Sequence, residues 1–176
     1  MPTDPAHDLL VLEYEQLKAE QRARITVRDN LVYVTVAAYA AVVAAVLASP
    51  RRSELLLLLP AVAIVLGWTH LAGDGRISAL GRYMRGALAP RLERLHPEAA
   101  PVFAWETEHR GERRRPSRKA LQLTADLMTF TVPAVAALVL YWASAPFNLA
   151  LTLVAGAELV LVVIALWQRV LHADLR

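Results

Sequence analysis

Two acidic residues lie inside long apolar stretches, and they are the side chains of this sequence best placed to do chemistry. Glu158 has nine residues of the stretch Leu149–Trp167 on each side of it, whereas Asp126 lies near the start of Leu121–Ala143. An ionised acid in the middle of a bilayer is costly, so such a residue is usually protonated, paired or facing water. We predict that Glu158 lines a polar path or pairs helices; the alternative is a neutral acid hydrogen-bonded inside a bundle.

Hydroxyl side chains on the other apolar stretches are the candidate partners of Glu158. Tyr39 lies near the middle of Leu31–Ser49, and Thr35 lies one helical turn before it on the same face. Thr129 and Thr131 occupy the third stretch, one helical turn to the inner side of the depth of Glu158. We therefore expect Thr35, Tyr39 and Thr129 to lie with Glu158 along one polar path.

Arg28 and Asp126 lie at matching depths at the ends of the first and third apolar stretches. Opposite charges at one depth can form an ion pair that closes this end of the bundle. The alternative is two separate side chains, each extending its charged end to the membrane surface. We expect the Arg28–Asp126 pair.

A basic cluster precedes the third apolar stretch. Its members are Arg113, Arg114, Arg115, Arg118 and Lys119. Such a cluster is typical of a topology signal next to a membrane span. The alternative is a binding site for anionic lipid head groups or for a nucleotide-like ligand. Nucleic acid is not an expected partner, because no nucleic-acid-binding motif accompanies the cluster.

The sequence contains none of the common catalytic or ligand-binding motifs. It lacks a phosphate-binding GxxxxGK[ST], a GxGxxG turn, an HExxH zinc motif and a GxSxG nucleophile motif. Its five histidines are scattered without metal-ligand spacing, and it has no cysteine. We therefore predict a protein without enzymatic activity, metal or cofactor.

The composition explains where these residues must lie. The chain has 176 residues, of which 56% are hydrophobic and 20% charged, and most of the apolar residues lie in a few long stretches. A membrane-spanning helix needs roughly 20 mostly apolar residues. Four stretches meet this need, namely Leu31–Ser49, Leu55–Ala72, Leu121–Ala143 and Leu149–Trp167. The class predicted is therefore all-α, a polytopic membrane protein with four spans in two hairpins.

The basic residues predict the orientation of these spans. Seventeen of the 19 Lys and Arg residues lie before the first span, between the second and third, or in the tail that contains Arg169. Only Arg51 and Arg52 lie on the opposite side. The positive-inside rule then places both termini in the cytoplasm of a bacterial inner-membrane protein. Tyr141 and Trp142 are expected at the outer interface.

The spans divide the chain into four segments. They are a cytoplasmic N-terminal helix (1–30), a first hairpin (31–72), a basic cytoplasmic segment (73–120), and a second hairpin with a short tail (121–176). No helix-breaking residue separates the N-terminal helix from the first span, so the two would form one helix about 65 Å long. The N-terminal part would either serve as an oligomerisation stalk or lie in solvent or on the bilayer.

Turn residues and prolines predict where the helices are interrupted. A turn is expected at 72–75, followed by a basic amphipathic helix over Arg76–Leu95 on the inner leaflet. Pro60 and Pro133 are expected to kink their spans, and Pro90 to interrupt the amphipathic helix.

Two parts of the sequence carry a resemblance. Tyr14-Glu15-Gln16-Leu17, continuing through Arg28-Asp29-Asn30-Leu31-Val32-Tyr33, resembles the start of uncharacterised small bacterial integral membrane proteins; Arg82-Tyr83 and Trp105-Glu106 resemble their central segment. More loosely, the layout is similar to four-helix membrane effectors of anti-phage systems. The resemblance implies a protein that oligomerises and breaches the membrane, and no catalytic residue carries over.

Two functions are consistent with these observations. The first is an oligomeric inner-membrane protein that forms or gates a pore or disrupts the membrane; the resemblance implies that it acts as a defence effector. The second is a non-catalytic adaptor, whose cytoplasmic helix and basic segment recruit a cytoplasmic partner or anionic lipid. The partners expected are the lipid bilayer and further copies of the chain.

Overall fold

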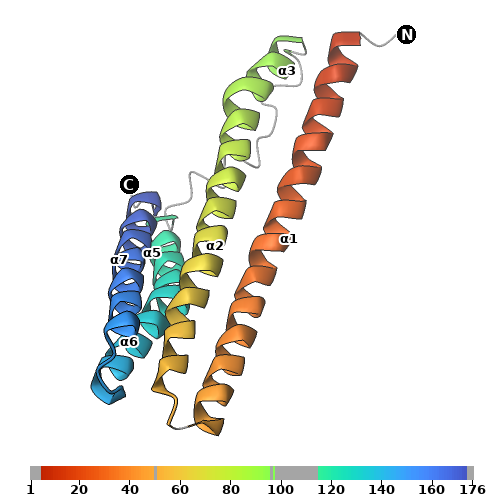
Figure 1. Ribbon diagram of the computed structural model, residues 1–176. Coiled ribbons are helices and arrows are strands. Elements are labelled where there is room, and N and C mark those ends of the chain that lie inside the picture. Colours follow the sequence, from red (N-terminus) through yellow and green to blue (C-terminus); the bar gives the residue numbers. More distant parts are fainter. Residues whose placement is uncertain (1–4, 50, 96, 98–114, 174–176) are drawn as a thin grey trace. The chain divides into compact units, whose positions relative to one another are not determined.

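Every regular element that the structure describes is a helix. The computed structural model describes residues 5–49, 51–95, 97 and 115–173 (Figure 1). The elements are α1 (Pro5–Ala48), η1 (Ser53–Leu57), α2 (Leu58–Tyr83), η2 (Met84–Leu88), α3 (Ala89–Leu95), α5 (Arg115–Asp126), η4 (Leu127–Thr131), α6 (Val132–Ser144) and α7 (Leu149–His172). The predicted all-α class is confirmed for these residues.

The helix α1 runs without interruption for 44 residues. It contains no glycine, and its single proline, Pro5, is its first residue, where a proline costs no hydrogen bond. The polar pair Asp29–Asn30 does not break it. The continuous helix predicted from His7 to the end of the first apolar stretch is therefore confirmed.

Four helical stretches are long and apolar enough to cross a membrane. They are Pro5–Ala48, Ser53–Leu95, Lys119–Ser144 and Leu149–His172. Between 11% and 33% of the most apolar window of each stretch is buried inside the structure. A helix of a soluble bundle buries its apolar stripe and exposes polar residues. Here the exposed faces are themselves apolar, as expected for a multi-pass membrane protein.

The turn predicted at 72–75 is wrong, because α2 continues through it to Tyr83. Glycine lowers helix stability by about 1 kcal/mol in comparison with alanine, but it does not forbid a helix. Asp74 accepts a hydrogen bond from Arg28 of α1 at 3.0 Å, which favours the helical arrangement of this segment. The amphipathic stretch that follows is therefore the continuation of α2 through η2 into α3.

The three prolines lie near the beginnings of helical elements. Pro60 is the third residue of α2, where no intrahelical donor is needed. Pro90 and Pro133 are each the second residue of a helix, and each follows a π-helical turn, η2 or η4. A proline ring collides with the carbonyl four residues before it, and a wider turn relieves this collision.

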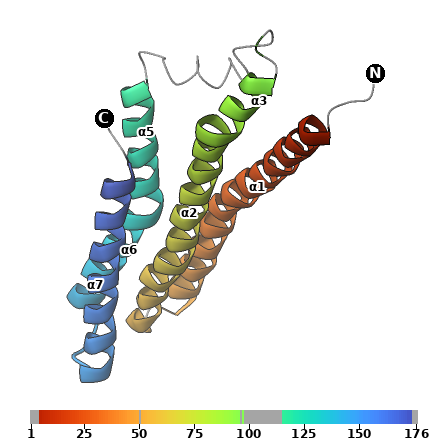
Figure 2. The same ribbon diagram turned by 90° about the horizontal axis from the view of Figure 1, so that it is seen from above.

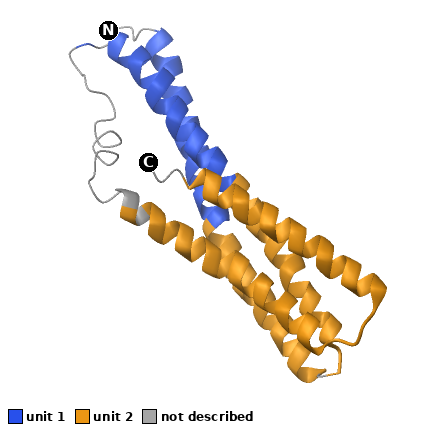
Figure 3. Cartoon of the chain, turned by 90° about the vertical axis from the view of Figure 1, so that its left-hand side faces the viewer, with its two compact units in different colours: residues 1–28, 73–115 blue, residues 29–72, 116–176 orange. Residues whose placement is uncertain are grey.

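The chain divides into two compact units (Figure 3). Unit 1 comprises residues 1–28 and 73–115, and unit 2 comprises residues 29–72 and 116–176. Both units are built from segments that are distant in the sequence, because α1 and α2 each contribute one end to each unit.

The core of unit 2 is centred on α6. Ala134, Ala137, Leu138 and Tyr141 of this helix are at most 2% exposed. Ala134 packs with Ala63 of α2 and Val162 of α7, and Ala137 packs with residues of α1 and α2. Small side chains on the buried face let neighbouring helices approach closely, which is the usual way of packing helices in lipid.

The second hairpin is closed by a short link between α6 and α7, which lie side by side in Figures 1 and 2. Asn148 caps the start of α7, since its Oδ1 accepts a hydrogen bond from the Leu151 amide at 3.3 Å. Tyr141, which was predicted at the outer interface, is buried and packs in the core against Leu57, Leu138 and Ala155. Its neighbour Trp142 is exposed.

Ala134→Leu should destabilise unit 2, because the added volume separates α6 from α2 and α7. We expect a loss of roughly 1–3 kcal/mol in the free energy of unfolding, measured by thermal unfolding in detergent. Ala136→Leu is the matched control, since Ala136 is exposed two residues away on the same helix. Equal stability of the two variants would contradict this description of the core.

Candidate functional site

One face of α7 carries two ionisable residues of unit 2, Glu158 and Arg169. Its buried positions are Ala155, Val162, Ala165 and Arg169, and Glu158 lies half-buried on the same side. Glu158 and Arg169 are 11 residues apart, which is about three helical turns. The face therefore has an acid near its middle and a cation near its end.

Arg169 is the functional candidate that sequence analysis missed. The sequence pattern shows Arg169 only as one of the cations of the tail, whereas in the structure it is buried, with 5% of its surface exposed. The signal that could have found it is its spacing, because Ala155, Val162 and Arg169 recur every seven residues and therefore share a face. A charged residue on a face of small apolar residues is expected to point inward.

The guanidinium of Arg169 lies against α2 and η4. Its Cζ atom is 4.9 Å from the centroid of the Phe130 ring, a cation–π contact. A Cβ atom at Gly67 would overlap Nη2 of Arg169 and would lie 3.1 Å from Cδ1 of Phe130. Only a glycine at position 67 therefore leaves space for the guanidinium in this position.

Phe130 also contacts α2 through the ring of His70. The ring of His70 lies 5.2 Å from that of Phe130 at an interplanar angle of 40°. Phe130 is 2% exposed and His70 is 7% exposed. His70, near the end of the second apolar stretch, therefore packs inward against Phe130.

Two further groups act on Arg169 electrostatically. They are the carboxylate of Asp126, at the end of α5, and the phenol of Tyr39 on α1. An unpaired buried cation is strongly unfavourable, and a nearby carboxylate and an aromatic face both reduce this cost. Arg169 therefore interacts with residues of three helical segments, namely Asp126, Phe130 and Tyr39.

Four buried polar atoms of unit 2 have no hydrogen-bond partner among the described residues. They are Oη of Tyr39, Oγ1 of Thr131, Oε2 of Glu158 and Nη2 of Arg169. Buried polar groups in native proteins are usually paired with protein or water. These atoms therefore have capacity for water, for a ligand or for groups of another subunit.

The hydroxyl groups predicted as partners of Glu158 differ in their hydrogen bonds. Thr129 donates to the carbonyl of Ala125 at 2.8 Å, and Thr35, which is fully buried, donates to the carbonyl of Leu31 at 2.7 Å. Both hydroxyls thus bond within their own helices. Tyr39 has no such bond, and its ring packs in the core beside Val42 and Ala63.

Arg28 has a partner that sequence analysis did not name. Its Nη1 donates to Oδ1 of Asp74 at 3.0 Å within unit 1. Asp126 belongs to unit 2, so the Arg28–Asp126 pair would join the two units and stays a prediction. A second contact of unit 1 joins the same pair of helices, since Tyr83 Oη donates to Oε1 of Glu13 at 2.6 Å.

The predicted basic cluster lies only partly within the described residues. Arg113 and Arg114 lie outside them, whereas Arg115, Arg118 and Lys119 belong to the first turns of α5. Within the part of the chain that the structure describes, no three His, Asp or Glu side chains gather as a metal site would require.

Comparison with known proteins gives no relative: no family model, curated protein or solved structure matches this chain.

Gly67→Ala should disturb the Arg169 contact, because the new methyl group takes the position of Nη2. Gly156 of α7 is the matched control, since a Cβ there meets nothing within 4 Å. We expect Gly156→Ala to be neutral or stabilising by up to about 1 kcal/mol through helix propensity. Gly67→Ala should be less stable than Gly156→Ala in thermal unfolding. The reverse order would contradict the placement of the Arg169 guanidinium beside Gly67.

The hydrogen bond to Glu13 raises the pKa of Tyr83 above its ordinary value of 10.0. The bond requires the protonated phenol, so its stabilising effect is present below pH 10 and is lost at higher pH as the phenol ionises. In an absorbance titration of tyrosinate, Glu13→Ala should lower the pKa of Tyr83 toward 10, whereas Glu15→Ala should leave it unchanged. Tyr83→Phe identifies the signal of this residue. The contact is contradicted if both alanine variants titrate as the unsubstituted chain does.

Proposed function

We propose that the four apolar stretches cross a bacterial inner membrane as two hairpins, with both termini and the basic segment 73–120 in the cytoplasm. The exposed apolar surface supports the membrane environment: Tyr33, Leu47 and Leu149 are 74%, 74% and 64% exposed. Soluble monomers rarely expose large contiguous apolar surfaces, and lipid is the solvent that favours them.

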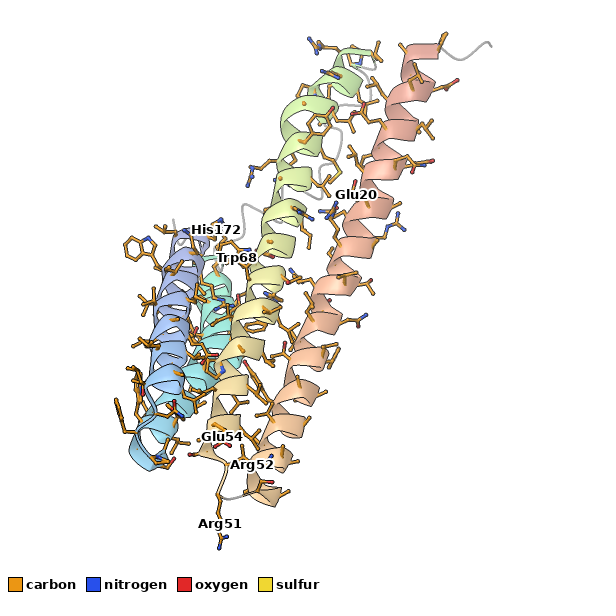
Figure 4. All side chains as sticks on the ribbon, in the orientation of Figure 1. Glu20, Arg51, Arg52, Glu54, Trp68 and His172 are labelled. Carbon is orange, nitrogen blue, oxygen red and sulfur yellow. The ribbon has the colours of Figure 1, made fainter. Side chains whose placement is uncertain are left out.

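The ends of unit 2 are consistent with this placement. Figure 4 shows Arg51, Arg52 and Glu54 at the link between α1 and α2, and Trp68 and His172 toward the opposite end of the unit. Charged residues and tryptophans are typical of the two boundaries of a membrane-spanning bundle. The large excess of Lys and Arg on one side supports the orientation.

We further propose that the protein is not an enzyme and that it forms or gates a pore as an oligomer. The observation that carries this proposal is the set of unpartnered polar atoms inside an apolar bundle, above all Oε2 of Glu158. Polar groups at membrane depth are costly and usually face water or one another. A hydrated path along the buried face of α7 would satisfy them.

Several copies of the chain would complete such a path. Ala37, Ala41 and Ala45 recur every four residues on α1, and all three are exposed in the single chain. Small residues at this spacing favour close packing of one helix on another in lipid. The resemblance to membrane effectors of anti-phage systems agrees with this proposal, and the role in defence is part of it.

Glu158→Ala should change conductance in planar bilayers, or toxicity on expression, without preventing membrane insertion. If the acid contributes about 1.4 kcal/mol to the passage of an ion, conductance changes roughly tenfold. Glu54→Ala is the matched control, because Glu54 is exposed at the α1–α2 link.

Normal conductance and toxicity in a well-inserted Glu158→Ala protein would contradict the pore. The adaptor function would then be favoured, in which the basic segment retains a cytoplasmic partner or anionic lipid. Neutralising Arg113, Arg114 and Arg115 would abolish that retention while leaving membrane permeability unchanged.

A further inference from the structure

The guanidinium of Arg169 is held in position but is not saturated with hydrogen bonds. Phe130 covers one of its faces, and Gly67 leaves space for one of its edges. Its Nη2 atom has no hydrogen-bond partner among the described residues, and Arg169 is only 5% exposed. A guanidinium fixed on an aromatic face keeps its planar N–H groups for bidentate contact with a carboxylate or phosphate.

Two buried hydroxyl groups of unit 2 have the same unused hydrogen-bonding capacity. Oη of Tyr39 is buried without a partner, and the phenol is close enough to Arg169 for an electrostatic interaction. Oγ1 of Thr131 is also buried without a partner, and Thr131 directly follows Phe130 in η4. A cation and two hydroxyl donors together match the oxygen atoms of an oxyanion.

The carboxylate of Asp126 interacts electrostatically with Arg169, so its negative charge would disfavour a second anion at this cation. It does not occupy Nη2, which lacks a hydrogen-bond partner. In the absence of a ligand, Asp126 offsets part of the charge of Arg169. A bound anion would be held by hydrogen bonds and by the remaining positive charge.

The depth of Arg169 indicates which anion can reach it. Arg169 lies two residues after Trp167, which is 62% exposed, and Trp68 is 52% exposed. Exposed tryptophans prefer the head-group level of a bilayer, where the phosphates of the lipids lie. This step rests on the membrane placement proposed above.

We propose that Arg169, together with Tyr39 and Thr131, forms a phosphate-binding site in unit 2, next to Gly67 and Phe130. The ligand chemistry is a phosphate oxyanion, supplied by the head group of an anionic lipid or by free phosphate. None of these residues belongs to the basic cluster that precedes the third apolar stretch.

The test measures ligand-induced thermal stabilisation of the full chain in dodecyl maltoside. The probes are inorganic phosphate, with chloride at equal ionic strength as its control, and phosphatidylglycerol, with phosphatidylcholine as its control. Stabilisation by phosphatidylglycerol alone identifies a lipid head group as the source. Stabilisation by inorganic phosphate identifies a free anion, and stabilisation by neither probe overturns the proposal.

Three variants assign the effect to this site. Arg169→Gln should weaken binding of the active probe roughly tenfold or more, because a charged hydrogen-bond donor is lost. Tyr39→Phe keeps the ring in the core and should weaken binding by about threefold, through the loss of one neutral hydrogen bond. Arg52→Gln, a cation at the α1–α2 link, should leave binding unchanged.

The assignment is wrong if Arg52→Gln and Arg169→Gln lose binding equally, since the effect would then be general electrostatic attraction. It is also wrong if both Arg169→Gln and Tyr39→Phe bind as the unsubstituted chain does. Should Arg169→Gln fail to fold, Tyr39→Phe alone decides the outcome. No conductance is measured in these experiments, so their result is independent of the pore proposed above.

Discussion

Close approach of helices at small side chains is the constraint on which unit 2 depends. In lipid, apolar side chains gain nothing by leaving their solvent, so helices associate through packing and polar contacts. Ala63, Ala134 and Ala155 are at most 2% exposed, and each lies where a larger side chain would separate two helices. Gly67 extends the same principle to a polar side chain, since its missing Cβ makes the space that the Arg169 guanidinium occupies.

Burial of Arg169 is the most expensive feature that this packing creates. Its cost is reduced by the Phe130 ring, by the charge of Asp126 and by the position of Arg169 in the last turn of α7, where the helix dipole favours a cation. Its Nη2 atom nevertheless lacks an acceptor in the described part of the chain. An unsatisfied buried cation is unfavourable, so a ligand, water or a second subunit is expected to supply its missing acceptor.

A wider helical turn before Pro133 contributes to this arrangement. Pro133 follows the π-helical turn η4, and that turn carries Phe130 and Thr131, both buried. An additional residue in one turn rotates the side chains that precede it relative to those that follow it. The turn therefore lets Phe130 meet Arg169 while Ala134 and Ala137 of the same continuous helical segment pack in the core.

Helical class and the four apolar stretches could be predicted from the sequence, because length and hydropathy are local properties that lipid imposes on every span. The continuity of α1 followed equally from the absence of breakers. The continuation of α2 past Gly73 and Gly75 could not, because a glycine permits both a turn and a helix and tertiary contacts such as Arg28–Asp74 select between them. The inward position of Arg169 was also decided by tertiary structure: spacing allows many residues to share a face, but only the packing of α7 against Gly67 and Phe130 determines which of them is buried.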